Sequence, residues 1–178
     1  GYETPSSNSV VGVAIPRRIA MKTVLCVFSV LVSTGLSSQL AAFDEGDLQE
    51  LKSTNECQRC DLTKANLEGA NLEGVNLVGS NMTAVSLTGA NLQRAILSDT
   101  NITFGKLIDT NLTGANLERA ILEGTSLNWS NLKGVNLTGA NLTGAYMSGA
   151  KNLNTAILTG AVFCKTIMPD GSRNDSDC

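Results

Sequence analysis

Large aliphatic residues recur at every fifth position through the middle of the chain. From Leu62 to Met147 there are 18 such positions, and 15 of them are Leu. The residue two positions before each of them is small or β-branched. On an α-helix, residues five apart are separated by about 500°, so this pattern gives no single apolar face. On a straight strand, an odd period sends successive side chains to opposite faces.

Both conflicts disappear if each five-residue unit is extended and the chain turns a corner between units. Ala65 and Leu67 then point the same way from one extended segment, toward an interior. If each corner turns about a right angle, four units close a square rung of about 20 residues, and the rungs stack about 4.8 Å apart. Gly fills ten of the 18 final positions of the units, where a corner needs permissive backbone angles. The pattern therefore predicts an all-β, quadrilateral β-helix.

The units read Ala65-Asn66-Leu67-Glu68-Gly69 and Ala140-Asn141-Leu142-Thr143-Gly144, among others. They resemble the A-(D/N)-L-x-x motif of the pentapeptide-repeat family over about 105 of the 178 residues. The resemblance implies a right-handed quadrilateral β-helix, a pentapeptide-repeat solenoid of about five rungs, which we place at residues 60–163. The step from Met147 to Leu153 is six residues, so we expect a bulge near Lys151.

The 20-residue period also aligns outward residues in columns along the stack. One column holds Asn71, Asn91, Asn111 and Asn131. Stacked asparagine side chains form hydrogen bonds with one another along such columns, so we interpret this ladder as structural.

Residues 1–42 have the order of residue types found in a secretory signal peptide. Arg17, Arg18 and Lys22 precede an apolar run, and small residues follow up to Ala42. The run is too short for a membrane span, so we predict none after the leader is removed. Met21 is an alternative start, which would make residues 1–20 non-native upstream sequence. The leader leaves the choice between Sec and twin-arginine export open.

An open β-helix needs a cover at each end, because an uncovered rung would pair with other chains. Residues 43–59 are predicted to form the N-terminal cap, with a short helix over 44–53 and Phe43, Leu48 and Leu51 against the first rung. Residues 164–178 are predicted to form the C-terminal cap. The flanks of the repeat resemble those of exported pentapeptide-repeat proteins from oxygenic phototrophs, which implies the periplasm or the thylakoid lumen.

Four cysteines remain after the predicted leader, an even number that suits an oxidising compartment. Proximity along the chain suggests the disulfides Cys57–Cys60 and Cys164–Cys178, one in each cap, although the sequence leaves the connectivity open. The alternative is a redox or metal motif at Cys57-x-x-Cys60. Zinc needs four ligands, and the chain has no His and no second Cys-x-x-Cys. A thioredoxin-like motif needs an α/β domain around it, which the repeat does not provide.

The sequence offers no set of residues for catalysis. The absence of His excludes Ser-His-Asp and Cys-His mechanisms. Carboxylates such as Asp99 and Glu118 occur singly at outward positions near Arg94 and Arg119, which favours solvated ion pairs. We therefore predict no enzymatic activity, no cofactor and no metal site.

The charge of the repeat bears on its partners. Residues 60–163 carry six basic and seven acidic side chains, so the coil is nearly neutral. Some pentapeptide-repeat proteins protect DNA gyrase by imitating duplex DNA, and such mimicry needs a long acidic surface. A gyrase-interacting DNA mimic is therefore the weaker alternative, and direct nucleic-acid binding is not expected.

Bulky apolar residues at outward positions interrupt the polar surface. Ile108, Trp129 and Tyr146 are predicted to share one face in adjacent rungs, with Phe104 at its edge. Aromatic residues beside charges are typical of binding patches. The sequence thus predicts a non-catalytic, exported structural or protein-interaction module, with a protein partner that the sequence does not identify. We define the aromatic patch as these residues and two flanking charges: Phe104, Lys106, Ile108, Asp109, Trp129 and Tyr146.

Overall fold

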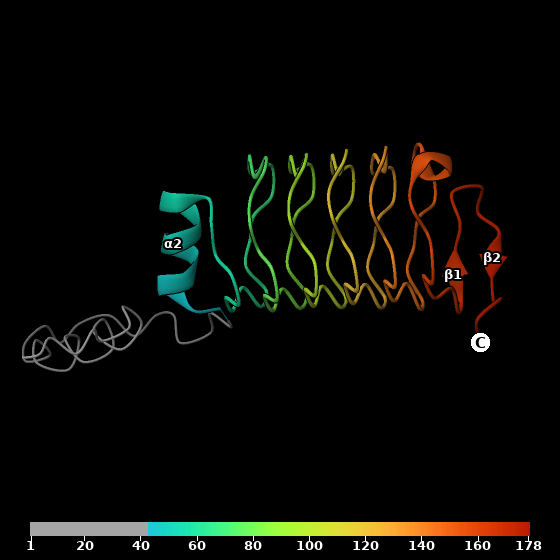
Figure 1. The fold of residues 1–178 in the computed structure, drawn as a ribbon, viewed down its shortest axis with the longest axis horizontal. Helices are drawn as coiled ribbons and strands as arrows, with labels where there is room; N and C mark the ends of the chain where they lie inside the picture. Colours follow the sequence, from blue (N-terminus) through green and yellow to red (C-terminus); the bar gives the residue numbers. More distant parts are fainter. Residues whose placement is uncertain (1–42) are drawn as a thin grey trace, which may run out of the picture. The chain divides into compact units, whose positions relative to one another are not determined.

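The structure is a computed structural model that describes residues 43–178; the predicted leader and Cys26 lie outside the described residues. Helix α2 spans Glu45–Thr54, a 3-10 helix η1 spans Leu153–Thr155, and strands β1 and β2 span Thr166–Ile167 and Arg173–Asn174. Between α2 and β1 the chain winds through stacked rungs (Figure 1). No helix within residues 43–178 has the length and apolar content that crossing a membrane would require.

Each rung is joined to the next by backbone hydrogen bonds between residues about 20 apart. Asn66 pairs with Ser86, and Ser86 with Lys106, in parallel bridges. Leu67 N donates to Ser86 O at 2.8 Å, and Ser86 N donates to Ala65 O at 3.0 Å. The predicted rung of four five-residue units is thereby confirmed. The bridges run from Glu56 to Ile167, beyond the predicted 60–163 at both ends.

The repeated glycines lie in the tight turns that form the corners of each rung. Ala65 N donates to Leu62 O at 3.0 Å and closes a four-residue turn. The third residue of the turn has a positive φ, 59° at Lys64 and 63° at Gly69 in the next unit. Gly adopts this conformation without the steric penalty of a Cβ, as a type II turn requires.

Aliphatic side chains fill the interior of the coil. Every repeat Leu, Met and Ile from Leu62 to Met147 is at most 5% exposed. Hydroxyl residues that replace the small apolar residue keep a hydrogen-bond partner. For example, Thr110 Oγ1 donates to Leu87 O at 2.9 Å, and Thr125 Oγ1 donates to Ile102 O at 2.8 Å. Burial of these hydroxyls therefore leaves no unmet polar group.

The extra residue after Met147 is absorbed in η1. Bridges before it step by 20 residues, as from Asn131 to Lys151, and bridges after it step by 21, as from Asn136 to Ile157. Asn152 has a φ of 63° and precedes the 3-10 turn. The extra residue lies near Lys151, as predicted, and the corner accommodates it as a 3-10 turn, which leaves the bridges on either side in place.

The predicted asparagine ladder forms in part. Asn91 Nδ2 donates to Asn71 Oδ1 at 3.1 Å, and Asn111 Nδ2 donates to Asn91 Oδ1 at 3.2 Å. The direct chain stops at Asn131, whose Nδ2 donates to Thr113 Oγ1 at 3.0 Å.

Helix α2 covers the first rung. The Asp44 carboxylate accepts from Gly46 N at the start of the helix, and Leu48 and Leu51 are buried against the rung. Asp47 Oδ2 accepts from Asp61 N at 2.8 Å, and Asp44 N donates to Asp61 O at 3.0 Å. These two bonds replace those that a preceding rung would make with Asp61.

The C-terminal cap repeats this arrangement at the other end. Strands β1 and β2 form an antiparallel hairpin, and the tail folds back onto the last rung. Phe163 N donates to Asp177 Oδ2 at 2.8 Å, and Asp177 N donates to Phe163 O at 3.0 Å. Lys165 N donates to Asp175 Oδ1 at 2.9 Å. Two tail aspartates therefore stand in for part of a following rung.

We expect Asp177→Ala to destabilise the protein by about 1 kcal/mol, because Phe163 N would lose its acceptor. Urea unfolding followed by circular dichroism measures the change. Glu123→Ala is the matched control, since this exposed carboxylate has no hydrogen bond to residues 43–178, and its effect should stay within about 0.5 kcal/mol. Equal effects of the two substitutions would contradict the capping role of Asp177.

Acid should weaken the C-terminal cap. Hydrogen bonding from Arg173 holds the pKa of the Asp175 carboxyl below its usual range. A lowered pKa in the folded state adds stability above the unfolded value of about 3.9, and that stability is lost as the pH falls through the folded pKa. We expect the thermal midpoint to fall below about pH 4, and to fall less in Arg173→Gln. The same pH profile in both proteins would contradict this origin.

Gly105 is the one inward small position occupied by Gly between Leu62 and Met147. A Cβ there would lie 2.7 Å from Ile102 Cγ2 and 2.9 Å from Ile102 O. We expect Gly105→Ala to lower the free energy of unfolding by about 1–3 kcal/mol through this clash. Gly89→Ala, whose Cβ would meet nothing within 4 Å, isolates the cost of a positive φ. A neutral Gly105→Ala would show that Ile102 can move aside.

Candidate functional site

The structure places the aromatic patch on one face of three successive rungs and its adjoining corners. Lys106, Ser126 and Tyr146 form one bridged column. Phe104 and Trp129 occupy the corners at the two edges of this face, in consecutive rungs. The patch residues, spread over 43 positions of sequence from 104 to 146, are thus gathered by the rung period.

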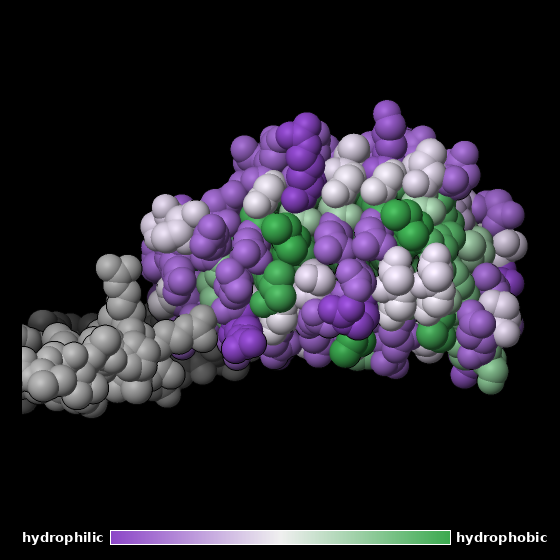
Figure 2. Space-filling model, viewed as in Figure 1, coloured by the Kyte–Doolittle hydropathy of each residue, from purple (hydrophilic) through white to green (hydrophobic). Residues whose placement is uncertain are grey.

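The members of the patch differ in exposure. Phe104, Trp129 and Tyr146 are 63%, 58% and 51% exposed. Ile108 occupies the outward position predicted for it, where its side chain is half-buried. On the face shown in Figure 2, apolar side chains form small separate groups among polar ones.

Phe104 and Trp129 adopt a backbone conformation that is unfavourable for bulky residues. Their φ angles are 57° and 59°, and a positive φ costs such residues roughly 1–2 kcal/mol. Each ring lies against the corner glycine of the next rung. A Cβ on Gly124 would lie 2.6 Å from Phe104 Cδ1, and one on Gly149 would lie 2.5 Å from Trp129 Cδ1. The rings are therefore held in place on one side and open to solvent on the other.

Gly124 and Gly149 are site residues that the sequence analysis missed. The signal that could have found them is an aromatic corner residue followed 20 positions later by Gly at the same corner, as in Phe104–Gly124 and Trp129–Gly149. Any side chain on either glycine would displace the ring beside it.

Polar groups that have no partner within residues 43–178 lie near the two aromatic rings. Lys106 and Asp109 are exposed, and neither forms an ion pair with any of the residues 43–178. Asn128, next to Trp129, donates through Nδ2 to Ser126 Oγ at 3.2 Å. Its Oδ1 is the buried side-chain oxygen without a hydrogen-bond partner in the described part of the chain. Buried polar atoms without a hydrogen-bond partner are rare in folded proteins, so Asn128 Oδ1 calls for an explanation.

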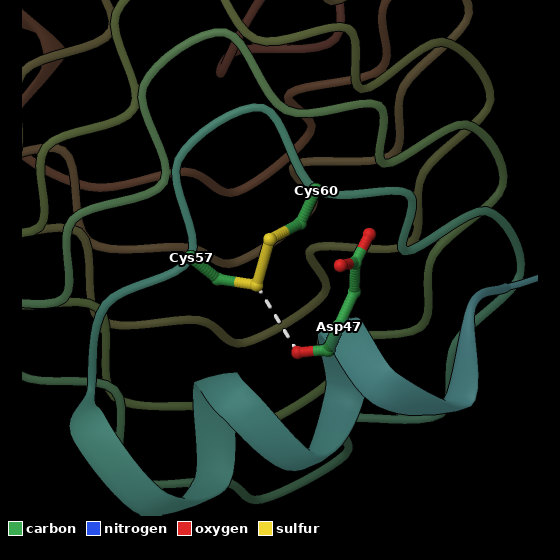
Figure 3. A group of neighbouring side chains, drawn as sticks. All are labelled: Asp47, Cys57 and Cys60. Atoms are coloured by element: carbon green, nitrogen blue, oxygen red, sulfur yellow. Dashed lines mark hydrogen bonds between the residues drawn. A yellow bond between two sulfur atoms is a disulfide. The ribbon is translucent and has the colours of Figure 1, made fainter. Parts of the chain in front are cut away.

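The four cysteines are joined as Cys57–Cys60 and Cys164–Cys178. The first pair is 0% and 1% exposed and lies between the first rung and α2 (Figure 3). Cys57 Sγ lies 3.1 Å from the carbonyl oxygen of Asp47. Helix α2 ends at Thr54, before the pair, so neither cysteine has the helix N-terminus that lowers the pKa of redox-active thiols.

Asp47, Cys57 and Cys60 bring ligand-type atoms within 4.8 Å of one another. Metal ions bind cysteine as the thiolate, whereas both sulfurs here are in a disulfide. Asp47 Oδ2 already accepts from Asp61 N, and a structural zinc site takes four ligands. In its oxidised form this cluster does not supply a metal site.

Some of the outward carboxylates form solvated ion pairs, as the sequence predicts, whereas Asp109 and Glu123 pair with no cation of residues 43–178. Arg119 Nε lies 2.8 Å from Asp99 Oδ1, and Arg119 also pairs with Glu118. Hydrogen bonding with Asp99 raises the pKa of Arg119, and the same bond lowers the pKa of the Asp99 carboxyl. Arg94 pairs with Glu73 at 3.5 Å. Exposed pairs of this kind contribute little to stability and do not suggest acid–base chemistry.

Comparison with known proteins identifies the repeat. The family model described as pentapeptide repeats (8 copies) matches residues 60–99, 95–134 and 110–149. Among solved structures, the pentapeptide repeat protein Rfr23 from the cyanobacterium Cyanothece is 30% identical with a TM-score of 0.51, covering 63% of this chain and 97% of that one. A search of curated proteins gave no match.

Two further solved structures are similar at lower scores. A pentapeptide repeat protein from the Arabidopsis thaliana thylakoid lumen is 28% identical, with a TM-score of 0.48 and coverage of 61% of this chain and 72% of that one. HetL from the cyanobacterium Nostoc, involved in heterocyst differentiation regulation, is 24% identical, with a TM-score of 0.45 and coverage of 67% and 76%. Both TM-scores are below 0.5, so we infer nothing about this chain from these two structures. On the family match and the likeness to Rfr23, this chain belongs to the pentapeptide-repeat family.

Proposed function

We propose that residues 43–178 are a non-catalytic protein-interaction module that works outside the cytoplasm and binds its partner through the aromatic patch. The observation that carries this proposal is the placement of Phe104 and Trp129, which sit at positive-φ corners and remain more than half exposed. The leader pattern in residues 1–42 and the two disulfides support export to the periplasm or the thylakoid lumen.

The corner aromatics are hard to explain by stability alone. Gly occupies most corners of the coil, and at positions 104 and 129 it would avoid a backbone cost of roughly 1–2 kcal/mol each. Packing against Gly124 and Gly149 offsets part of that cost but leaves most of each ring in solvent. Strained residues of this kind are a reason to suspect function. Rigid aromatic side chains bind with little loss of conformational entropy, which suits a contact surface.

The two alternatives have weaker support. A DNA mimic needs an acidic array, but the coil has six cations against seven acids, and Arg119 pairs with both Asp99 and Glu118. A thiol–disulfide function at Cys57 and Cys60 needs access for a partner thiolate, but both sulfurs are buried under α2.

Trp129→Gly and Phe104→Gly should separate binding from stability. We expect each to leave the free energy of unfolding within about 1 kcal/mol of the parent, because relief of the positive φ offsets lost packing. Affinity capture from an extract of the source organism is quantified by mass spectrometry. We expect either variant to recover at least about tenfold less of the partner than the parent protein does. Arg94→Gly, at a corner away from the patch, is the matched control and should capture as the parent does.

The same partners at the same yield from the parent and both aromatic variants would overturn the patch as the contact surface. Fusion of a reporter to the full chain tests the location separately. Retention of the reporter in the cytoplasm would overturn the exported part of the proposal and restore the DNA mimic as a candidate.

A further inference from the structure

The C-terminal end of the coil is covered on one side only. There, Asp177 and Asp175 supply the acceptors that Phe163 N and Lys165 N would find in a following rung. Residues 151–161, which form the other side of the last rung and which we call the open half-rung, receive no such cover.

The open half-rung presents backbone donors without acceptors. Leu158 N and Gly160 N donate to no group within residues 43–178. One rung earlier, the equivalent Leu137 N donates to Ile157 O at 2.8 Å, and Gly139 N donates to Thr159 O at 2.9 Å. The donors therefore point out of the end of the coil, in the direction in which the ladder would continue.

Matching acceptors flank these two donors along the chain. Ala156 O and Ala161 O accept no hydrogen bond from the described residues. The equivalent carbonyl of Val135 accepts from Ile157 N at 2.9 Å, and that of Ala140 accepts from Val162 N at 2.9 Å. Two donors flanked by two acceptors thus repeat, along the open half-rung, the arrangement found between the rungs of the coil, and a further backbone segment laid along this edge can satisfy it.

Apolar side chains lie beside the free backbone groups of the open half-rung. Leu153 and Leu158 occupy inward positions but are half-buried, whereas Leu132 and Leu137 beneath them are 0% and 1% exposed. A shallow, open hollow of about 440 Å³ adjoins Leu153 and is also lined by Met168 and Pro169 of the cap, among others.

We propose that the open half-rung binds an extended apolar peptide segment of another protein, which adds to the coil as a further half-rung. The ladder specifies the backbone of the ligand. Ala156 and Leu158, two residues apart and both half-buried, specify apolar side chains at alternate positions of the ligand. The hairpin of β1 and β2 extends farther along the coil than η1 (Figure 1), so the open half-rung lies in a step beside the cap. A single strand fits such a step better than the blunt end of a second coil. This site is separate from the aromatic patch.

The test uses the full chain and a fluorescent synthetic peptide with the sequence of residues 131–140, which forms the half-rung beneath the open one. We expect the peptide to bind, and hydrogen exchange at the amides of Leu158 and Gly160 to slow when it does. The same peptide with N-methyl groups on alternate residues should bind at least about tenfold more weakly, because its backbone donors are blocked. Leu158→Pro should weaken binding likewise, since it removes a donor that the folded chain does not use.

Trp129→Gly should bind the peptide as the parent does, so this result is independent of the proposed function of the patch. Two outcomes would overturn the inference. One is unchanged exchange at Leu158 and Gly160 with about 1 mM peptide. The other is a dimeric protein in which these amides are already protected without peptide, since a second copy would then cover the end.

Discussion

The parallel ladder of backbone hydrogen bonds between rungs is the interaction on which the rest of this structure depends. It requires residues about 20 apart to meet in register, so each rung must close in four equal units. Closure in turn imposes a positive φ at every corner and a narrow interior that holds one large and one small residue per unit. Each end of the coil must also satisfy or conceal an edge of the ladder.

Most of the fold could be predicted because its constraints act within a single unit. Ala65 and Leu67 indicate an inward face, and Gly69 indicates a corner, without knowledge of any distant residue. Features that depend on contact between rungs could not be predicted in the same way. Gly105 is small because of the Cγ2 of Ile102, and the extra residue near Lys151 becomes a 3-10 turn because neighbouring rungs stay in register.

The candidate site shows the same division. The period placed Phe104, Trp129 and Tyr146 near one another, since a 20-residue repeat determines which face each residue occupies. Exposure could not be read from the period, because outward residues of the same face differ. Ile108 is half-buried, whereas Trp129 is mostly exposed and its ring lies against the glycine of the next rung. Likewise, proximity suggested the pairing of Cys57 with Cys60, but not the burial of their sulfurs under α2.

The two caps engage the same face of the coil, and this constrains how the protein can change in length. Asp44 and Asp47 hold Asp61, and Asp177 holds Phe163, which adjoins Val162 in the column above Asp61. Duplication of a whole rung keeps both caps and every column aligned. The coil can therefore lengthen while each cap keeps its present contacts with the terminal rung. Duplication of a single five-residue unit would turn the C-terminal cap by a quarter of a rung and separate surface residues that now share a face. Gene duplication in this chain is therefore neutral for the architecture only in steps of four units.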